Sequence, residues 1–237
     1  MVFLNTIAAI DIVIAVLLMI TSYIIGSIPF GLVLGKLIKG IDIRQYGSKN
    51  IGSTNAIRVL GKKIGFLVFF CDVLKGMLII IIVKLLAHFN IWFTPIEEMW
   101  YGALAILGHG FPIFLNFKGG KVVATSLGVV IILSPLSAIS CLLIFLILIY
   151  TTGYVSLGST FAALTVVTVG WLLYFYGIEA TNILEYFIGK TTLSICLLFT
   201  IATVLIILKH MKNYKRLLNG TENNFKKNKK LKKEQNQ

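Results

Sequence analysis

The chain has 237 residues, of which 57% are hydrophobic and only 13% are charged, and its formal net charge at pH 7 is +13. A soluble domain of this length needs more charged residues to cover its surface, so the composition excludes an ordinary soluble enzyme and indicates an integral membrane protein. The basic residues are concentrated near one end, since ten of the 22 Lys and Arg residues lie from Lys209 onward. This distribution favours a basic tail near anionic lipids over nucleic-acid binding.

Apolar segments, taken in chain order, predict an all-α helical bundle with about seven transmembrane helices. About 20 apolar residues are needed to cross a bilayer, so the third and fourth of these segments are short for full spans. If they form a re-entrant pair, the number of spans falls from seven to five. The expected helices cover residues 12–35, 64–86, 99–107, 122–133, 136–150, 157–176 and 191–208.

The basic residues also predict an orientation. Seven Lys or Arg residues lie in residues 36–63, two in residues 118–121 and ten from Lys209 onward, and the seven-span arrangement places all three regions on one side. Because basic connections stay in the cytoplasm, we expect the N-terminus outside and the C-terminus inside. The expected organisation is one transmembrane domain, residues 1–222, followed by a disordered lysine-rich tail, residues 223–237.

The first polar cluster runs from Gly47 to Asn55 and is followed by Arg58. Small residues leave backbone N–H groups accessible to a phosphate, and the start of a following helix adds a favourable dipole. Arg58 can bind two phosphate oxygens at once. The alternative is an ordinary turn between two helices.

The second cluster contains Lys118 and Lys121 on either side of Gly119-Gly120, after His109. Two lysines around paired glycines at a membrane border suit an anion, although they would also serve as headgroup anchors.

The third cluster is Tyr154–Ser159, and the fourth contains His210 and Asn213, which share one face of the last predicted helix. Hydroxyl groups in spans often bond to their own helix, and an interfacial histidine is often only a capping residue. The expected orientation nevertheless places all four clusters on the cytoplasmic side, where loops on one face would form a single anion site.

These motifs together resemble the PlsY family, the bacterial acyl-phosphate:glycerol-3-phosphate acyltransferases. The resemblance rests on GSIPFGLVLGK at Gly26–Lys36, IDIRQYGSKNIGSTNAIRVLGKKIG after it, DVLKG at Asp72–Gly76, GHGFPIFLNFKGGKVVAT at Gly108–Thr125, YVSLGS at Tyr154–Ser159 and KHMKNYKRLLNGTE at Lys209–Glu222. Three positions depart from the usual motifs: Lys49 and Val122 replace glycines, and Gly153 replaces a residue that is often basic.

The resemblance implies transfer of a fatty acyl group from a long-chain acyl phosphate to the 1-hydroxyl of glycerol 3-phosphate. The products would be lysophosphatidate and inorganic phosphate, made at the cytoplasmic face of a bacterial plasma membrane. It implies no cofactor and no metal, and the expected partners are the two substrates and membrane lipids.

The resemblance also implies the site residues. The expected catalytic residues are Ser48, Arg58, Lys121, Ser159, His210 and Asn213. The expected substrate-binding residues are Gly47, Asn50, Gly52, Thr54, Asn55, His109, Lys118, Gly119, Gly120 and Ser156.

The sequence lacks the motifs of two common acyl-transfer mechanisms. No aspartate stands five positions after His88, His109 or His210, and there is no GxSxG nucleophile elbow. An acyl phosphate has a good leaving group, so we expect direct attack by the glycerol hydroxyl, with catalysis by positioning and charge stabilisation. The base is either His210 or a substrate phosphate.

The alternative function is transport of a small anion or lipid precursor. Transporters bind their substrates near the membrane midplane. Here the polar clusters border one side of the membrane, and only Asp72 and Lys75 lie clearly within a predicted span. We interpret these two residues as a structural ion pair.

Overall fold

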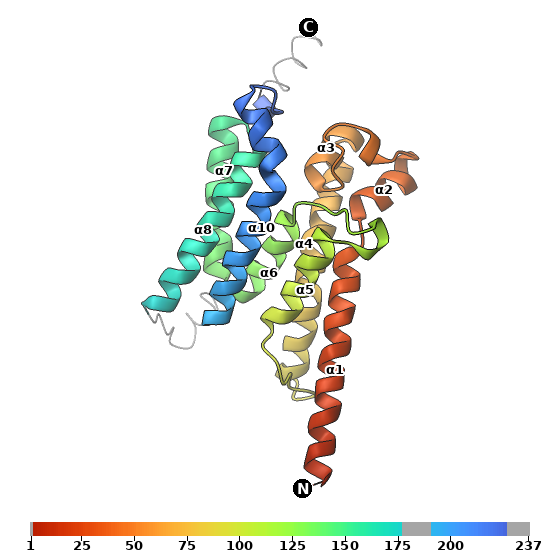
Figure 1. Cartoon of the computed structure of the whole chain (residues 1–237), viewed down its shortest axis with the longest axis vertical. Coiled ribbons are helices and arrows are strands. Elements are labelled where there is room, and N and C mark those ends of the chain that lie inside the picture. Colours follow the sequence, from red (N-terminus) through yellow and green to blue (C-terminus); the bar gives the residue numbers. More distant parts are fainter. Residues whose placement is uncertain (1, 177–190, 227–237) are drawn as a thin grey trace. The chain divides into compact units, whose positions relative to one another are not determined.

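The computed structural model describes residues 2–176 and 191–226, which form helices and connecting loops with no β-strand among them (Figure 1). The chain divides into two compact units, Met1–Ile132 and Leu133–Gln237. The lysine-rich residues 227–237, predicted to be disordered, lie outside the described residues.

The first unit contains the helices up to residue 132 and two short 3₁₀ turns. The α-helices are α1 (Val2–Ser27), α2 (Phe30–Lys39), α3 (Ser53–Leu60), α4 (Lys62–His88), α5 (Met99–Gly110) and α6 (Val123–Leu133), and the turns are η1 (Ile43–Gln45) and η2 (Ile113–Leu115). Helices α1, α4 and α5 pack against one another, while α2 and α3 pack on α4.

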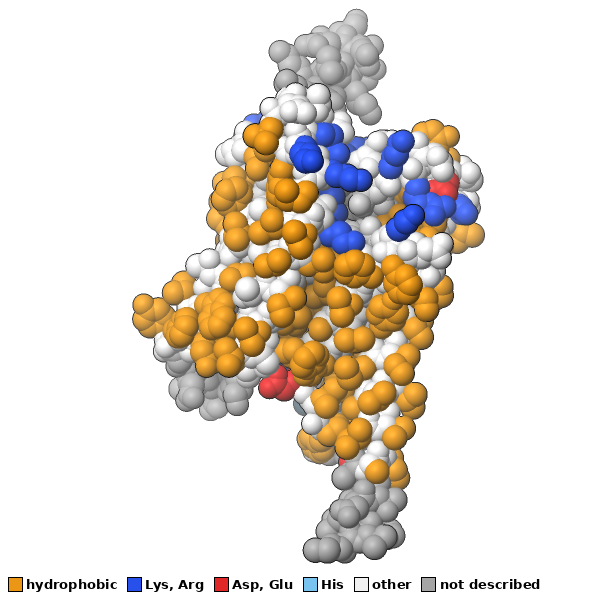
Figure 2. All heavy atoms as spheres, in the orientation of Figure 1, with side chains coloured by type: hydrophobic (Ala, Val, Ile, Leu, Met, Phe, Trp, Pro, Cys, Tyr) orange, Lys and Arg blue, Asp and Glu red, His pale blue; other side chains and the backbone are white. Residues whose placement is uncertain are grey.

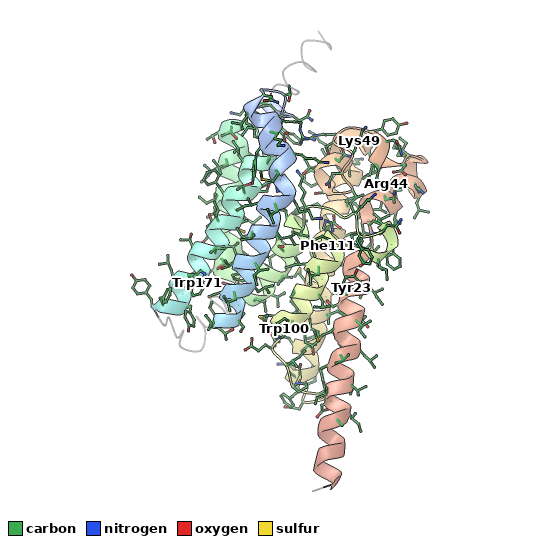
Figure 3. All side chains as sticks on the ribbon, in the orientation of Figure 1. Tyr23, Arg44, Lys49, Trp100, Phe111 and Trp171 are labelled. Carbon is green, nitrogen blue, oxygen red and sulfur yellow. The ribbon has the colours of Figure 1, made fainter. Side chains whose placement is uncertain are left out.

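The second unit contains α7 (Pro135–Thr152), α8 (Val155–Phe175) and α10 (Leu193–Leu218), with α8 packed against both of the others. Trp171 on α8 donates a hydrogen bond from Nε1 to Thr200 Oγ1 on α10 at 3.1 Å (Figure 3).

Five described helices are long and apolar enough to cross a membrane: α1 from Ala9, α4, α7, α8 and α10. Helices α5 and α6 have 12 and 11 residues, which at about 1.5 Å per residue reach only part of the way across a hydrocarbon core of about 30 Å. The third and fourth predicted helices are therefore short in the structure as well.

One predicted helix was wrong. Residues 12–35 were expected to form a single helix, but α1 ends at Ser27 and α2 begins at Phe30. Pro29 lies between them, has no N–H to donate and cannot continue the α1 hydrogen-bond ladder.

Small residues allow α1 and α5 to approach closely. A Cβ atom at Gly26 would overlap the backbone of Ala105, and one at Gly108 would overlap the carbonyl of Tyr23. The Tyr23 hydroxyl donates a hydrogen bond to the carbonyl of Phe111 at 2.8 Å, so it ties α1 to the loop after α5 (Figure 3).

Hydrophobic side chains cover much of α1 and α5 on the face in Figure 2, as expected for lipid-facing helices. In the first unit, Lys and Arg side chains gather instead around α2 and α3 (Figure 2). The exposed basic residues of this region are Lys36, Lys39, Arg44, Lys49, Lys62 and Lys63.

Candidate active-site loops

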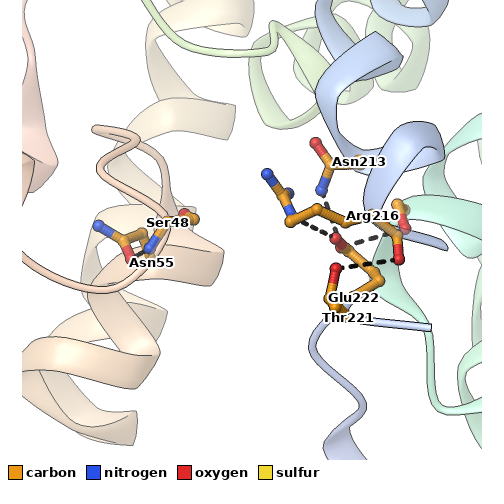
Figure 4. A network of polar contacts seen from close by, with 7 residues as sticks. Ser48, Asn55, Asn213, Arg216, Thr221 and Glu222 are labelled. Carbon is orange, nitrogen blue, oxygen red and sulfur yellow. Dashed lines mark hydrogen bonds and ion pairs between the residues drawn. The ribbon is translucent and has the colours of Figure 1, made fainter. Parts of the chain in front are cut away.

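The first polar loop, residues 47–55, is organised by the side chain of Asn55, which is only 1% exposed. Its Oδ1 accepts a hydrogen bond from the N–H of Ser48 at 2.8 Å, shown in Figure 4. Its Nδ2 donates to the carbonyls of Ile43 at 3.0 Å, Tyr46 at 3.2 Å and Asn50 at 2.9 Å. Asn55 therefore shapes the loop from beneath.

This loop also contains left-handed backbone. Gly47 has φ +60° and Lys49 has φ +58°, so the position where the family motif carries glycine is one that lysine occupies at a steric cost. Helix α3 begins directly after Gly52, whose N–H is bonded to Asn50 Oδ1 at 2.9 Å. Arg58 lies half-buried in the last turn of α3.

The second loop, residues 117–122, packs on His109 at the end of α5. The N–H of Gly120 donates to the carbonyl of His109 at 3.0 Å. A Cβ atom at Gly120 would overlap the His109 ring, and one at Gly119 would overlap the carbonyls of His109 and Gly110. Both glycines are therefore needed for this close packing, and Lys121 follows them directly.

Val122, the residue after Lys121, has φ +58° and is fully buried. A β-branched residue is unfavourable in this conformation. Lys49 and Val122, the two departures from family glycines, thus share the same left-handed backbone.

Beneath the second loop lies a buried polar group. Asp72 Oδ1 is 2.8 Å from Lys75 Nζ and 3.5 Å from His109 Nδ1. Lys75 Nζ also donates to the carbonyl of Ile28, between α1 and α2, at 2.9 Å. The predicted ion pair of Asp72 and Lys75 is confirmed.

In the second unit, Ser159 on α8 lies 3.1 Å from His210 Nε2 on α10, measured from Oγ. His210 Nδ1 is 2.8 Å from the carbonyl of Ile206. A carbonyl can only accept, so Nδ1 carries a proton. In a neutral ring, Nε2 is then an acceptor within reach of the Ser159 hydroxyl. Tyr214 stacks on the His210 ring and its hydroxyl is 2.6 Å from Thr160 Oγ1.

Glu222 connects three side chains of the second unit and is only 8% exposed (Figure 4). Its Oε1 accepts from Asn213 Nδ2 at 2.8 Å and from Ser156 Oγ at 3.3 Å, and its Oε2 accepts from Arg216 Nε at 2.7 Å. The carboxylate therefore fixes the orientation of the Asn213 side-chain amide.

The residues after Glu222 fold back on the connection between α7 and α8. Asn224 Nδ2 donates to the carbonyl of Thr152 at 2.9 Å, and the N–H of Phe225 donates to the carbonyl of Gly153 at 2.9 Å. Gly153 has φ +77°, and a Cβ atom there would overlap Asn224. A basic side chain at this position, as in the family motif, would need a different local arrangement.

The structure thus groups the predicted residues within each unit. Ser48 and Asn55 meet in the first loop, His109 meets Gly119-Gly120 in the second, and Ser159 meets His210. Sequence reasoning did not assign roles to three supporting residues, which are Glu222, Tyr214 and Thr160. Tyr214 contacts Thr160, and Glu222 contacts Ser156, each across more than fifty positions of sequence. Only these contacts reveal the supporting residues.

The described residues contain no cluster of three or more His, Cys, Asp or Glu side chains that could hold a metal ion.

A family model and two relatives of known name match most of this chain. The family model described as glycerol-3-phosphate acyltransferase matches residues 16–220. The glycerol-3-phosphate acyltransferase of Acholeplasma laidlawii is 41% identical over 220 residues, covering 88% of this chain and 91% of that protein. The protein of the same name from Bacillus subtilis (strain 168) is 43% identical over 206 residues, covering 87% and 95%.

Two crystal structures of PlsY, described as an integral membrane glycerol 3-phosphate acyltransferase, are also similar. The glycerol 3-phosphate form has a TM-score of 0.73 and 37% identity and covers 89% of this chain and 95% of that one. The lysophosphatidic acid form has a TM-score of 0.71 and 36% identity, with coverage of 89% and 94%. The chain therefore belongs to the glycerol-3-phosphate acyltransferase family and shares the helical membrane fold of PlsY.

Proposed function

We propose that this chain transfers a fatty acyl group from a long-chain acyl phosphate to the 1-hydroxyl of glycerol 3-phosphate. The products are lysophosphatidate and inorganic phosphate. The observation that carries the proposal is the likeness, over 89% of this chain, to a protein solved both with glycerol 3-phosphate and with lysophosphatidic acid. These two ligands are an acceptor and its acylated product, so they define the reaction class. Family membership likewise favours an enzyme over the transporter alternative.

Each unit contains its own candidate substrate ligands. Arg58 and Lys121 of the first unit provide positive charge for the phosphate of glycerol 3-phosphate. In the second unit, Ser159, His210 and Asn213 provide hydrogen-bonding groups for glycerol 3-phosphate. Their pre-arrangement supports this role, because Glu222 orients Asn213 and Ile206 fixes the tautomer of His210.

The first loop holds the acyl phosphate in this proposal. Ser48 and Asn50 lie on a loop with glycines at positions 47 and 52, and helix α3 begins at its end. Backbone N–H groups and a helix start favour an anion. Asn55 contributes by shaping this loop, since its carboxamide is bonded to four backbone groups.

The reaction follows from the chemistry of the donor. The glycerol 1-oxygen attacks the acyl carbon, the new ester bond forms, and the bond from the acyl carbon to the phosphate oxygen breaks. The hydroxyl proton passes to His210 Nε2 or to a substrate phosphate. The first loop, which holds the acyl phosphate in this proposal, stabilises the negative charge that develops as phosphate leaves.

The proposed orientation places these loops in the cytoplasm of a bacterium, with the N-terminus outside. The exposed basic residues around α2 and α3 of the first unit support this orientation. Connections rich in Lys and Arg stay on the cytoplasmic side of a membrane.

The test uses the detergent-purified chain with glycerol 3-phosphate and either palmitoyl phosphate or palmitoyl-CoA. Mass spectrometry of the lipid extract should detect palmitoyl lysophosphatidate with palmitoyl phosphate alone. Product from palmitoyl-CoA alone would keep the acyltransferase and overturn the donor. No product from either donor, in protein that unfolds cooperatively on heating, would overturn the function.

A further inference from the structure

The ion pair of Asp72 and Lys75 lies inside the first unit, and the proposed reaction does not use it. Both residues are only 2% exposed, on the long apolar helix α4. Buried charges are costly, and an ion pair is no more stabilising than well-packed apolar side chains of similar size. Stability alone therefore does not explain why this unit contains the pair.

Asp72 has a second neighbour, His109, which connects the ion pair to the second loop. Its Oδ1 lies 3.5 Å from Nδ1 of His109, which is 5% exposed. This separation is longer than a strong hydrogen bond, but it is an effective electrostatic contact between buried groups. The carboxylate therefore favours the ring orientation that directs Nδ1 toward α4.

The opposite edge of the same ring supports the second loop. Gly120 lies so close to the imidazole that a Cβ atom would overlap Nε2, and the N–H of Gly120 is bonded to the carbonyl of His109 at 3.0 Å. Any rotation of the ring would move Gly120 or leave a void beneath it. The residue after Gly120 is Lys121.

The group is also anchored at its far end. Lys75 Nζ donates to the carbonyl of Ile28 at 2.9 Å and lies 5.6 Å from the centre of the Phe30 ring. Ile28 and Phe30 flank Pro29, at the break between α1 and α2. The polar contacts thus run continuously from this break through α4 to the end of α5.

We propose that His109, held by Asp72, is a positioning residue that sets the place of Lys121 through Gly119-Gly120. This inference rests on the proposed function, in which Lys121 binds the phosphate of glycerol 3-phosphate. In this proposal His109 acts on the loop and does not itself bind the substrate. Gly120 is then required by the ring beneath it and Gly119 by the carbonyls of His109 and Gly110, as well as by any phosphate above them.

The first test compares steady-state kinetics of His109→Gln with those of the wild-type chain. Because misplacing a substrate ligand by about 1 Å can lower rates by about a hundredfold, we expect the KM for glycerol 3-phosphate to rise about tenfold or more. The KM for palmitoyl phosphate should stay within about twofold of the wild-type value. A residue with only a structural role would instead lower the yield of active enzyme and leave both KM values unchanged.

His88→Gln is the matched control, since His88 lies at the exposed end of α4. It should leave both KM values unchanged.

A double-mutant cycle with Lys121→Ala tests whether His109 acts through Lys121. If it does, adding His109→Gln to Lys121→Ala should change the KM no further. Independent, multiplicative effects would overturn the proposal.

Removing Asp72 alone leaves Lys75 buried without its partner and risks misfolding. Replacing both, as Asp72→Leu with Lys75→Met, removes the charges together and keeps the helix apolar. This variant should fold and should raise the KM for glycerol 3-phosphate as His109→Gln does. A folded double variant with wild-type KM would overturn the role of Asp72.

The series also separates this inference from the proposed function. A raised KM in Lys121→Ala with an unchanged KM in His109→Gln would overturn the positioning role alone. Failure of the wild-type chain to form lysophosphatidate would overturn the proposed function, and the positioning role with it.

Discussion

The hydroxyl oxygen of Ser159 lies 3.1 Å from Nε2 of His210, although 51 positions separate the two residues. The same hydroxyl lies 2.9 Å from the carbonyl of Val155. Since it has one proton, it can donate to only one of these acceptors at a time. A glycerol hydroxyl that enters the site can therefore replace Ser159 at His210 while Ser159 donates to its own helix.

This arrangement predicts that His210→Gln separates the two candidate bases. If His210 accepts the glycerol proton, the substitution should lower kcat by about a hundredfold or more. If a substrate phosphate is the base, glutamine should preserve most of the rate. The measurement is kcat at saturating palmitoyl phosphate and glycerol 3-phosphate. His88→Gln, at the exposed end of α4, serves as the control.

Lys121→Ala should lower kcat/KM for glycerol 3-phosphate by about tenfold or more, because it removes a positive charge from the proposed phosphate site. Lys84→Ala is the matched control. Lys84 is paired with Glu98 at 2.8 Å and lies far along α4 from the second loop, so its loss should leave kinetics unchanged. Near-wild-type kinetics in Lys121→Ala would exclude Lys121 from the site.

Glu222→Gln should weaken the second unit. The buried carboxylate accepts hydrogen bonds from Ser156, Asn213 and Arg216, and losing its charge should destabilise the fold by about 1–3 kcal/mol. Thermal unfolding in detergent should show a lower midpoint. Glu98→Gln, which alters a more exposed ion pair with Lys84, should shift the midpoint much less. Equal shifts would contradict the stabilising role proposed for the hydrogen bonds of Glu222.

Lys49→Gly and Lys49→Ala should differ in stability. Both remove the charge, but only glycine adopts φ +58° without steric cost, so the glycine variant should be the more stable by up to about 1 kcal/mol. Unfolding temperatures of the two variants test this directly. If both variants also bind palmitoyl phosphate less tightly than the wild type, the Lys49 ammonium contacts the donor. Unchanged binding of palmitoyl phosphate would show that Lys49 is only a tolerated replacement of glycine and does not contact the donor.

Much of the fold could be predicted because apolar runs and helices coincide in a membrane protein. The break at Pro29 was missed because the segment is apolar on both sides, and hydropathy does not register a missing N–H. Helix α10 continues to Leu218, beyond its predicted end at residue 208. Its last turns are polar in sequence, yet they bury His210 and Asn213 within the second unit.

The candidate site was less accessible to prediction. Motif resemblance could name His109, Gly119 and Gly120 as a group, but it could not indicate that the ring lies against Gly120. Asn55 was expected to bind substrate, which stays a prediction, and the sequence did not indicate that its carboxamide bonds to the loop backbone. Such contacts depend on tertiary packing, which neither spacing nor composition encodes.

The most direct test of the proposed reaction is the release of inorganic phosphate by the purified chain, measured alongside lysophosphatidate formation. With palmitoyl phosphate and glycerol 3-phosphate together, one phosphate should appear for each lysophosphatidate, and omission of either substrate should abolish both. Phosphate release without glycerol 3-phosphate, or lysophosphatidate formed without matching phosphate, would contradict direct acyl transfer from acyl phosphate.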